Sequence, residues 1–202
     1  AGQNRIFIDC NVQSPADMLS PGRIGMTAIL PVRFTAMKWY GKGPLETYPD
    51  RQCGGRMGVY SEDVRNQPFY LRPQEYGLHT ESRSMRLTDP DRADFVRFEA
   101  ACPMAMSAVP YSDLQLWNAR HPFELPAPEA LYVHLDYAHR GLGNSSCGPD
   151  VLPTYRIDDR PCRFGFALEA GLGEREDNPF GPIPEEITAY HPWKAVEEQD
   201  GT

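Results

Sequence analysis

The chain has 202 residues, of which 41% are hydrophobic and 11% aromatic, so it can bury a sizeable core and is not intrinsically disordered. Its formal net charge of −8 argues against nucleic acids and anionic membranes as partners. Its 20 prolines and 17 glycines are scattered among short apolar runs, which favours an all-β fold with many turns.

The five cysteines are odd in number and form no C-x-x-C pair, which argues against a disulfide framework or a zinc site. We therefore expect reduced thiols and a cytoplasmic protein. No apolar stretch is long enough to cross a bilayer, and no signal peptide is visible. The polar opening of the chain leads straight into a predicted strand, so we expect a part of a larger protein.

Polar and apolar residues alternate along several segments, as they do in half-buried β-strands. In the first of these segments, Ile6, Ile8, Cys10 and Val12 share one face. The segments that predict strands are 5–13, 23–31, 36–40, 79–88, 94–100, 104–109, 131–138 and 162–170.

One short helix is predicted among these strands. Ser112 is suited to cap it, Leu114 and Trp117 would lie on one face, and Pro122 would end it. From Glu174 onward the alternation ends, and the chain becomes rich in proline and acidic residues. We therefore divide the chain into a β-sandwich domain at 1–171 and an acidic, proline-rich extension at 172–202.

The most distinctive segment is WYGKGPLETYPDR, at 39–51. Asp50 and Arg51 can form a bidentate pair that would hold this loop in place. One interpretation is a platform for a sugar ring, built on Trp39 or Tyr40. The other is a long loop locked to the domain, and this structural interpretation is the favoured one.

Two further segments carry candidate site residues. In PQEYGLHTESR, at 73–83, Glu75 could face a cleft or cap neighbouring amides. In VHLDYAHRGLGNSSCGP, at 133–149, a glycine-containing turn follows two histidines, His134 and His139. These histidines could be the acid and base of a sugar epimerase, but they fall on opposite faces of an extended strand unless a bulge intervenes.

The acids in motif-like contexts are Glu46, Asp50, Glu75 and Asp136. Retaining glycoside hydrolysis needs two carboxyl groups roughly 5 to 5.5 Å apart, which a sequence cannot certify. No βα alternation of a catalytic barrel is present. We therefore expect these acids to make structural hydrogen bonds to loops.

The three segments, in this order, resemble the C-terminal β-sandwich (small chain, domain 5) of family-two glycoside hydrolase β-galactosidases, over 23–170. The resemblance implies a β-supersandwich of the galactose mutarotase-like kind, placed after a catalytic barrel. It implies a parent enzyme that hydrolyses terminal β-D-galactosides with retention. The catalytic glutamates and the Mg and Na ligands of that enzyme would lie upstream, so this chain alone would be inactive and would hold no metal or cofactor.

The chain departs from the family pattern in two of the three segments. Tyr76 stands where asparagine is usual, and His79 where arginine is usual. The third loop looks one residue shorter than in relatives with G-G-D-D-S-W, and Cys147 falls near the place of the tryptophan that stacks on the leaving group. Aromatic stacking should therefore be lost there. Cys147 is not expected to act as a nucleophile, because the sequence does not indicate a histidine and an acid beside it.

Three functional hypotheses follow from the resemblance. The leading one is an accessory module of a homo-oligomeric β-galactosidase, which forms the aglycone side of the active site beside the upstream barrel and supports assembly. Its candidate substrate-binding residues are His139, Asn144, Ser145, Ser146, Cys147, Trp39 and Glu75. The second is a free-standing carbohydrate-binding or mutarotase-like protein in which His134, His139 and Glu75 converge on one cleft. The third is a structural domain without sugar contact.

The resemblance begins partway into the family's C-terminal domain, so we expect earlier strands of the sandwich to be missing. An apolar face or sheet edge would then be exposed, and the chain would associate with itself to cover it. A strictly monomeric elution at high concentration would count against this.

Overall fold

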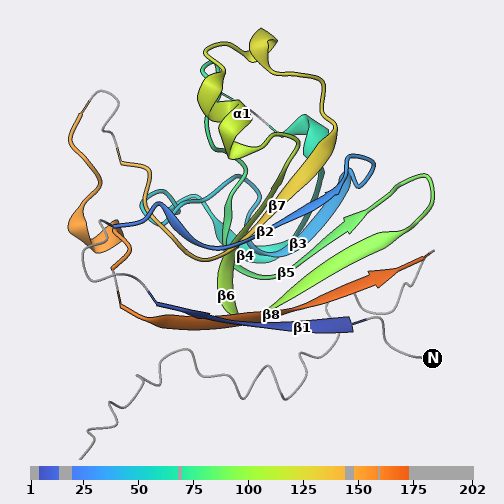
Figure 1. Ribbon diagram of the computed structural model, residues 1–202, viewed down its shortest axis with the longest axis horizontal. Helices are drawn as coiled ribbons and strands as arrows, with labels where there is room; N and C mark the ends of the chain where they lie inside the picture. Colours follow the sequence, from blue (N-terminus) through green and yellow to red (C-terminus); the bar gives the residue numbers. More distant parts are fainter. Residues whose placement is uncertain (1–4, 14–19, 68–69, 144–147, 159, 173–202) are drawn as a thin grey trace, which may run out of the picture.

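The computed structural model describes residues 5–13, 20–67, 70–143, 148–158 and 160–172, and shows an all-β fold in which every strand pair is antiparallel (Figure 1). The fold class predicted from the alternation is therefore confirmed. The strands are β1 (Arg5–Val12), β2 (Arg23–Pro31), β3 (Ala36–Gly43), β4 (Arg56–Asp63), β5 (His79–Thr88), β6 (Phe95–Val109), β7 (Ala130–His139) and β8 (Cys162–Gly171). The described helices are α1 (Asp113–Asn118) and the 3-10 turns η1 (Val64–Asn66), η2 (Pro122–Glu124) and η3 (Pro153–Tyr155).

Strand β6 connects the two halves of the sheet. The main path of paired strands runs β1-β8-β6-β5-β3-β4, and β7 joins β6 to β2. The first half of β6, up to Ala100, pairs with β8, and the second half, from Ala105, pairs with β7. Pro103 lies between them, where a residue without an N–H costs no ladder hydrogen bond. The two strands predicted at 94–100 and 104–109 are thus one strand that bends as it changes partner.

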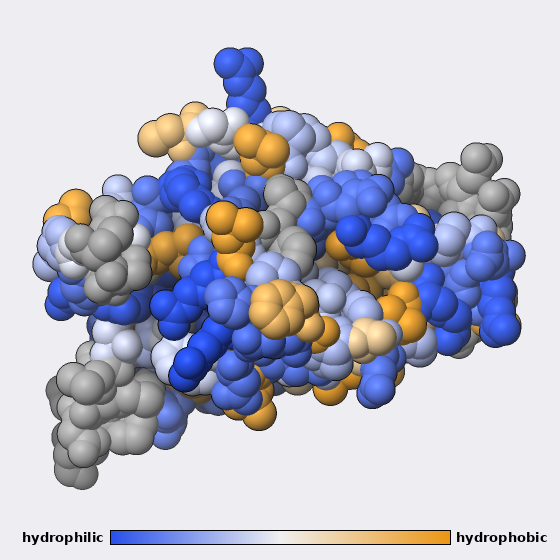
Figure 2. All heavy atoms as spheres, turned by 90° about the horizontal axis from the view of Figure 1, so that it is seen from above, coloured by the Kyte–Doolittle hydropathy of each residue, from blue (hydrophilic) through white to orange (hydrophobic). Residues whose placement is uncertain are grey.

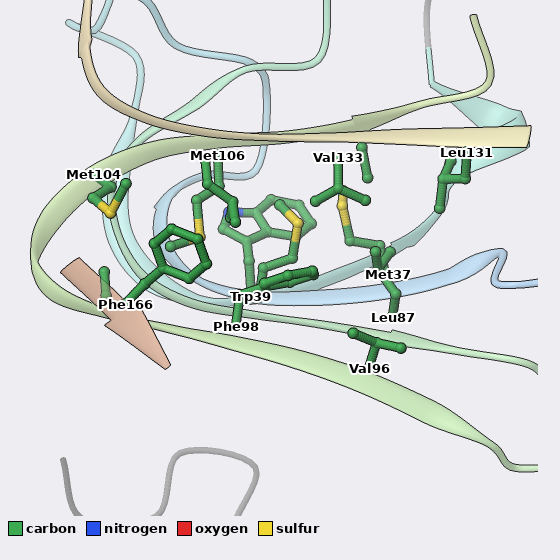
Figure 3. Close-up of a cluster of buried hydrophobic side chains, with 14 of the residues drawn as sticks. Met37, Trp39, Leu87, Val96, Phe98, Met104, Met106, Leu131, Val133 and Phe166 are labelled. Atoms are coloured by element: carbon green, nitrogen blue, oxygen red, sulfur yellow. The ribbon is translucent and has the colours of Figure 1, made fainter. Parts of the chain in front are cut away.

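The bend of β6 folds the sheet around the main hydrophobic core. Figure 3 shows Val96 and Phe98, from the first half of β6, on one side of this core, and Met104 and Met106, from the second half, on the other. Trp39 of β3 lies between them and is 1% exposed. The alternation in the sequence reflects this arrangement in strands such as β3, of which one face packs inward.

Strand β4 was not predicted. Within the part of the chain that the structure describes, it pairs with β3 alone, and Met57 and Val59 on it remain about half exposed. Gly58 interrupts the apolar pattern, and it faces Gly41 of β3 across the pair. A Cβ at Gly58 would lie 3.0 Å from the ring of Tyr60, so the ring occupies the space that a side chain would need. Packing against a glycine leaves little signal in the sequence.

Helix α1 begins where the sequence predicts, but it buries a different face. The Gln115 amide donates to Ser112 Oγ (3.2 Å) and the Ser112 amide to Gln115 Oε1 (2.8 Å), which is a complete capping box. The buried residue of the helix is Leu116, whereas Leu114 and Trp117 are 67% and 85% exposed. The predicted apolar face is therefore wrong, because a helix this short anchors through one side chain.

Exposed apolar residues occur on the strands at the sheet edges. Ile6 and Phe7 of β1, and Ile29 of β2, are more than half exposed, and each of these strands has one paired neighbour among the described strands. On the face drawn in Figure 2, hydrophobic residues are dispersed among hydrophilic ones. Self-association through such residues stays a prediction. Among the described residues, no helix combines the length and apolar character needed to cross a membrane.

Candidate functional site

The first and third motif segments meet through Asp50. Its carboxylate accepts hydrogen bonds from the backbone amides of Leu142 (3.0 Å) and Gly143 (2.8 Å). A Cβ at Gly141 would lie 2.7 Å from Asp50 Cγ, so this close approach requires a glycine. The bidentate pair predicted between Asp50 and Arg51 does not form, because the Asp50 carboxylate is committed to the other loop.

The first and second motif segments meet through Glu46. Its Oε1 accepts from the Arg51 guanidinium and from the Tyr70 hydroxyl, and its Oε2 accepts from the Gly77 amide at 2.8 Å. Tyr70 also accepts from Arg51, at 2.8 Å. Glu46 and Asp50 thus make the structural hydrogen bonds to loops that we expected of the motif acids.

Trp39 belongs to the core. Its ring stacks on His79, with ring centroids 3.9 Å apart, and its indole N–H donates to the Lys42 carbonyl at 3.1 Å. A ring that is 1% exposed presents no face to a ligand. Tyr40, its neighbour on β3, is partly exposed on the opposite face of the strand. For Trp39, these contacts support the structural interpretation of the loop over the sugar platform.

A β-bulge brings the two histidines of β7 to one face. The register of β2 against β7 shifts between Ile24, which faces Ala138, and Gly25, which faces Asp136. The extra residue on β7 changes the alternation beyond it. His139 therefore reaches the same charged cluster as His134, which is the condition that we set for the two histidines to act together.

Glu75 links two cationic side chains of this cluster. Its Oε1 lies 2.6 Å from His139 Nε2, and its Oε2 lies 2.7 Å from Arg23 Nη2. The Tyr48 ring packs edge-on against His139, with centroids 5.4 Å apart. The second and third motif segments and strand β2 thus converge on one carboxylate.

His139 is held in its protonated form. Its Nδ1 lies 2.6 Å from the Arg140 carbonyl and its Nε2 lies 2.6 Å from the Glu75 carboxylate. Both partners are acceptors, so both ring nitrogens must carry a proton. Burial acts to lower the pKa of His139, but the hydrogen bond and charge of Glu75 outweigh it and raise that pKa. Burial likewise acts to raise the pKa of Glu75, and His139 and Arg23 outweigh it and lower that pKa.

His134 and Asp136 are buried on the same face. Their pKa values are shifted in the directions opposite to those of His139 and Glu75. Burial, together with the nearby charge of Arg23, lowers the pKa of His134 to about 4. Burial raises the pKa of Asp136 to about 7, against the charge of Arg23. His134 Nδ1 lies 3.1 Å from the Thr27 hydroxyl, which as a donor satisfies the neutral ring. The pKa values of the two histidines are therefore shifted in opposite directions, that of His139 upward and that of His134 downward.

We call Arg23, Glu75, Asp113, His134, Asp136 and His139 the Arg23 cluster. Sequence reasoning found Glu75 and the two histidines, but it missed the roles of Arg23 and Asp113. Arg23 opens a predicted strand and Asp113 opens the helix, and neither lies in a motif. Only the pairing of β2 with β7, and the position of α1, bring them in. The remaining candidates, Asn144, Ser145, Ser146 and Cys147, lie outside the described residues.

Comparison with known proteins identifies relatives of the chain. Residues 1–168 match a protein family described as "Beta galactosidase small chain". A β-galactosidase of Arthrobacter is 35% identical over 157 residues, which is 74% of this chain and 15% of that protein. A β-galactosidase of Staphylococcus xylosus is 31% identical over 156 residues, 76% of this chain and 16% of that protein.

A third relative extends the match. The β-galactosidase BgaC of Bifidobacterium adolescentis is 35% identical over 175 residues, 84% of this chain and 16% of that protein. The chain thus spans about one sixth of the length of these curated relatives.

Proposed function

Because the chain belongs to the β-galactosidase small-chain family, we propose that it is the C-terminal domain of a β-galactosidase that hydrolyses terminal β-D-galactosides with retention. The match over 1–168 and the names of the relatives support this proposal. The catalytic barrel and any Mg or Na ligands belong to the rest of the parent enzyme. This chain alone is inactive in hydrolysis, and the enzyme is a cytoplasmic homo-oligomer.

Within that enzyme, the chain forms one wall of the active site on the aglycone side and supports assembly. The observation that carries this role is the convergence of the three motif segments. Asp50, in the first motif segment, fixes the backbone just before the segment 144–147. Glu46, in the same first segment, binds the backbone of the second motif segment. Such fixed loops suit a surface that must keep its shape beside a substrate. In this segment Asn144 offers a carboxamide, Ser145 and Ser146 offer hydroxyl groups and Cys147 offers a thiol, in place of an aromatic ring.

The proposal is tested in a chimera. This chain replaces the matching segment of the Arthrobacter β-galactosidase, and hydrolysis of lactose and of nitrophenyl β-galactoside is measured. We expect an active chimera, no activity from either part alone, and a loss of about tenfold or more in the Asp50→Ala chimera because the loop is misplaced. The Asp158→Ala chimera is the control, since Asp158 is exposed and pairs only locally with Arg160. A folded but inactive chimera would rule the proposal out.

The second candidate function is that of a carbohydrate-binding module with mutarotase-like activity. It is favoured by the convergence of Glu75, His139 and His134 in the Arg23 cluster, because a charged and a neutral imidazole can supply acid and base to an anomeric centre. We expect the intact chain to accelerate the optical rotation change of fresh α-galactose, and Glu75→Gln to abolish this acceleration. A rate equal to that of buffer would remove this candidate.

A further inference from the structure

One face of the main strand path points away from the core. Residues that stand opposite each other in paired strands share a face. Trp39, Met85 and Phe98 form such a row on the core side. The next row lies on the other side, which we call the outer face, and it crosses all six strands through Val59, Tyr40, Ser84, Glu99, Ala167 and Phe7.

The outer face has no described layer over it. The described elements that pack extensively against these six strands are all their neighbours in the sheet. Phe7, Tyr40, Met57 and Val59 lie on this face and are between 38% and 54% exposed. An apolar surface of this kind, spread over three strands, suits contact with another segment of protein.

Three cations stand side by side on the outer face. Lys38 faces Arg86 across β3 and β5, and Arg86 faces Arg97 across β5 and β6. Like charges directly opposite each other destabilise a sheet, and an acidic ligand would relieve this repulsion. Burial and the charge of Arg97 lower the pKa of Arg86, as expected for a cation beside another cation.

The acidic residues of the outer face are already paired with arginines. Glu99 and Glu169 bind Arg97, Asp9 binds Arg163, and Asp63 binds Arg65. Lys42 contacts the neutral amide of Gln52. Among the described residues, no carboxylate forms an ion pair with Lys38 or Lys42. The face therefore offers cations to an acidic partner, although the chain as a whole has a net charge of −8.

The extension at the end of the chain has the complementary composition. Residues 173–202, which lie outside the described residues, contain eight acidic and two basic residues, a net charge of −6. They also contain three aromatic residues, Phe180, Tyr190 and Trp193. Carboxylates and aromatic rings together match a face that presents cations beside exposed apolar side chains. The family match ends at residue 168, so this segment lies outside it.

The extension also starts in the right place and is long enough. Gly171, the last residue of β8, faces Phe95, two residues from the pair of Arg97 and Glu169. The path from β8 to β4 crosses four strand spacings, about 19 Å, which 30 residues can span several times over. Prolines at 179, 182, 184 and 192 are unsuited to a new edge strand, and they leave side-chain contacts across the face as the mode of binding.

We propose that residues 173–202 dock on the outer face of their own chain. Their carboxylates bind the cations around Lys38 and Arg86, and their aromatic side chains cover Tyr40 and Val59. The docked extension closes this face to a second copy of the chain. The proposal concerns the side of the sheet away from the core and is independent of both candidate functions.

The test is photo-cross-linking within the intact chain. The residue p-benzoylphenylalanine replaces Val59, which is half exposed, and the products of irradiation are identified by mass spectrometry. We expect a cross-link to a peptide from 173–202, in a product with the mass of a single chain. The control position is Trp117, which is 85% exposed on α1, on the side of the molecule away from β1 and β8 (Figure 1). A cross-linker there should not reach the extension.

A charge reversal tests the electrostatic part of the proposal. Lys38→Glu, at an exposed position, should lower the yield of the cross-link from position 59 about fivefold, because it repels the acidic segment. Arg120→Glu makes the same change of charge at an exposed position after α1 and should leave the yield unchanged. Added salt should lower the yield of the chain with native charges, since it screens exposed ion pairs.

Three results would overturn the proposal. The first is the absence of any product between position 59 and residues 173–202. The second is an equal yield from positions 59 and 117, or an equal loss with Lys38→Glu and Arg120→Glu, because either would indicate random encounters of a tethered segment. The third is a product with twice the mass of the chain as the main species, which would make a second copy the occupant of the outer face.

Discussion

Replacing Gly25 by alanine is expected to destabilise the protein by about 3 kcal/mol, the upper range for overpacking a fixed site. A Cβ at Gly25 would lie 2.4 Å from Asp136 Oδ1, 2.5 Å from the Leu135 carbonyl oxygen and 2.7 Å from Asp136 Cα. Two of these atoms belong to the backbone of the paired strand. The clash can be relieved only by moving β2 away from β7, which breaks the register that forms the bulge.

The matched control is Gly22→Ala, because a Cβ at Gly22 would meet nothing within 4 Å. Urea unfolding followed by tryptophan fluorescence should give a much lower midpoint for Gly25→Ala. For Gly22→Ala the free energy of unfolding should stay within about 0.5 kcal/mol of that of the unsubstituted chain. The His139 ring should also lose its raised pKa in Gly25→Ala, since the bulge places it beside Glu75. Equal midpoints for the two variants would show that the strand pair is looser than the structure indicates.

The second large effect is on the pH dependence of stability, and Asp136→Asn should reveal it. The folded chain keeps a proton on Asp136 up to a pKa of about 7, whereas the unfolded chain loses it near 3.8. The folded state therefore binds more protons in this window, and the free energy of unfolding falls as pH rises from about 4 to about 7. The difference between the two pKa values corresponds to about 4 kcal/mol. Asparagine removes this slope, so the gain should be largest at pH 8.

His134 acts in the opposite direction over nearly the same window. Its folded pKa of about 4 lies below the ordinary 6.5, so the unfolded chain binds the extra proton and stability is lost as pH falls from 6.5 toward 4. In the unsubstituted chain the two slopes nearly cancel. Asp136→Asn should therefore show a steep loss of stability on acidification, and His134→Gln a steady loss on alkalisation. Parallel profiles for the two variants, measured by urea unfolding from pH 4 to 8, would contradict both assignments.

The sequence predicted most strands because one face of each is buried, as in β1, where Ile8, Cys10 and Val12 pack inward. It also predicted the cap of α1, because Ser112 and Gln115 satisfy each other locally. Both signals act between residues close in the chain. Strand β4 was not predicted, because Gly58 packs under Tyr60 and interrupts the apolar pattern of the strand.

The candidate site was predictable only in part, for a related reason. Glu75 and His139 stand out in motifs, but their contact depends on a bulge opposite Gly25, which period-two alternation does not encode. Arg23 and Asp113 join the cluster through pairings between distant segments. Trp39 stood out as an aromatic residue before a loop, yet the core uses it.

The pairing of β1 with β8 has a consequence for how the chain is made. Arg5 faces Glu169 and Val12 faces Cys162, so nearly the whole domain lies between the two strands in sequence. Such distant contacts are slow to form, because the entropy of closing the long loop is lost before any contact is gained. During synthesis the first strand must wait, with Ile8 and Val12 uncovered, until the last one leaves the ribosome. A chain that ends before residue 171 would leave β1 without its complete pairing partner. We therefore expect aggregation of nascent or shortened chains to begin at β1.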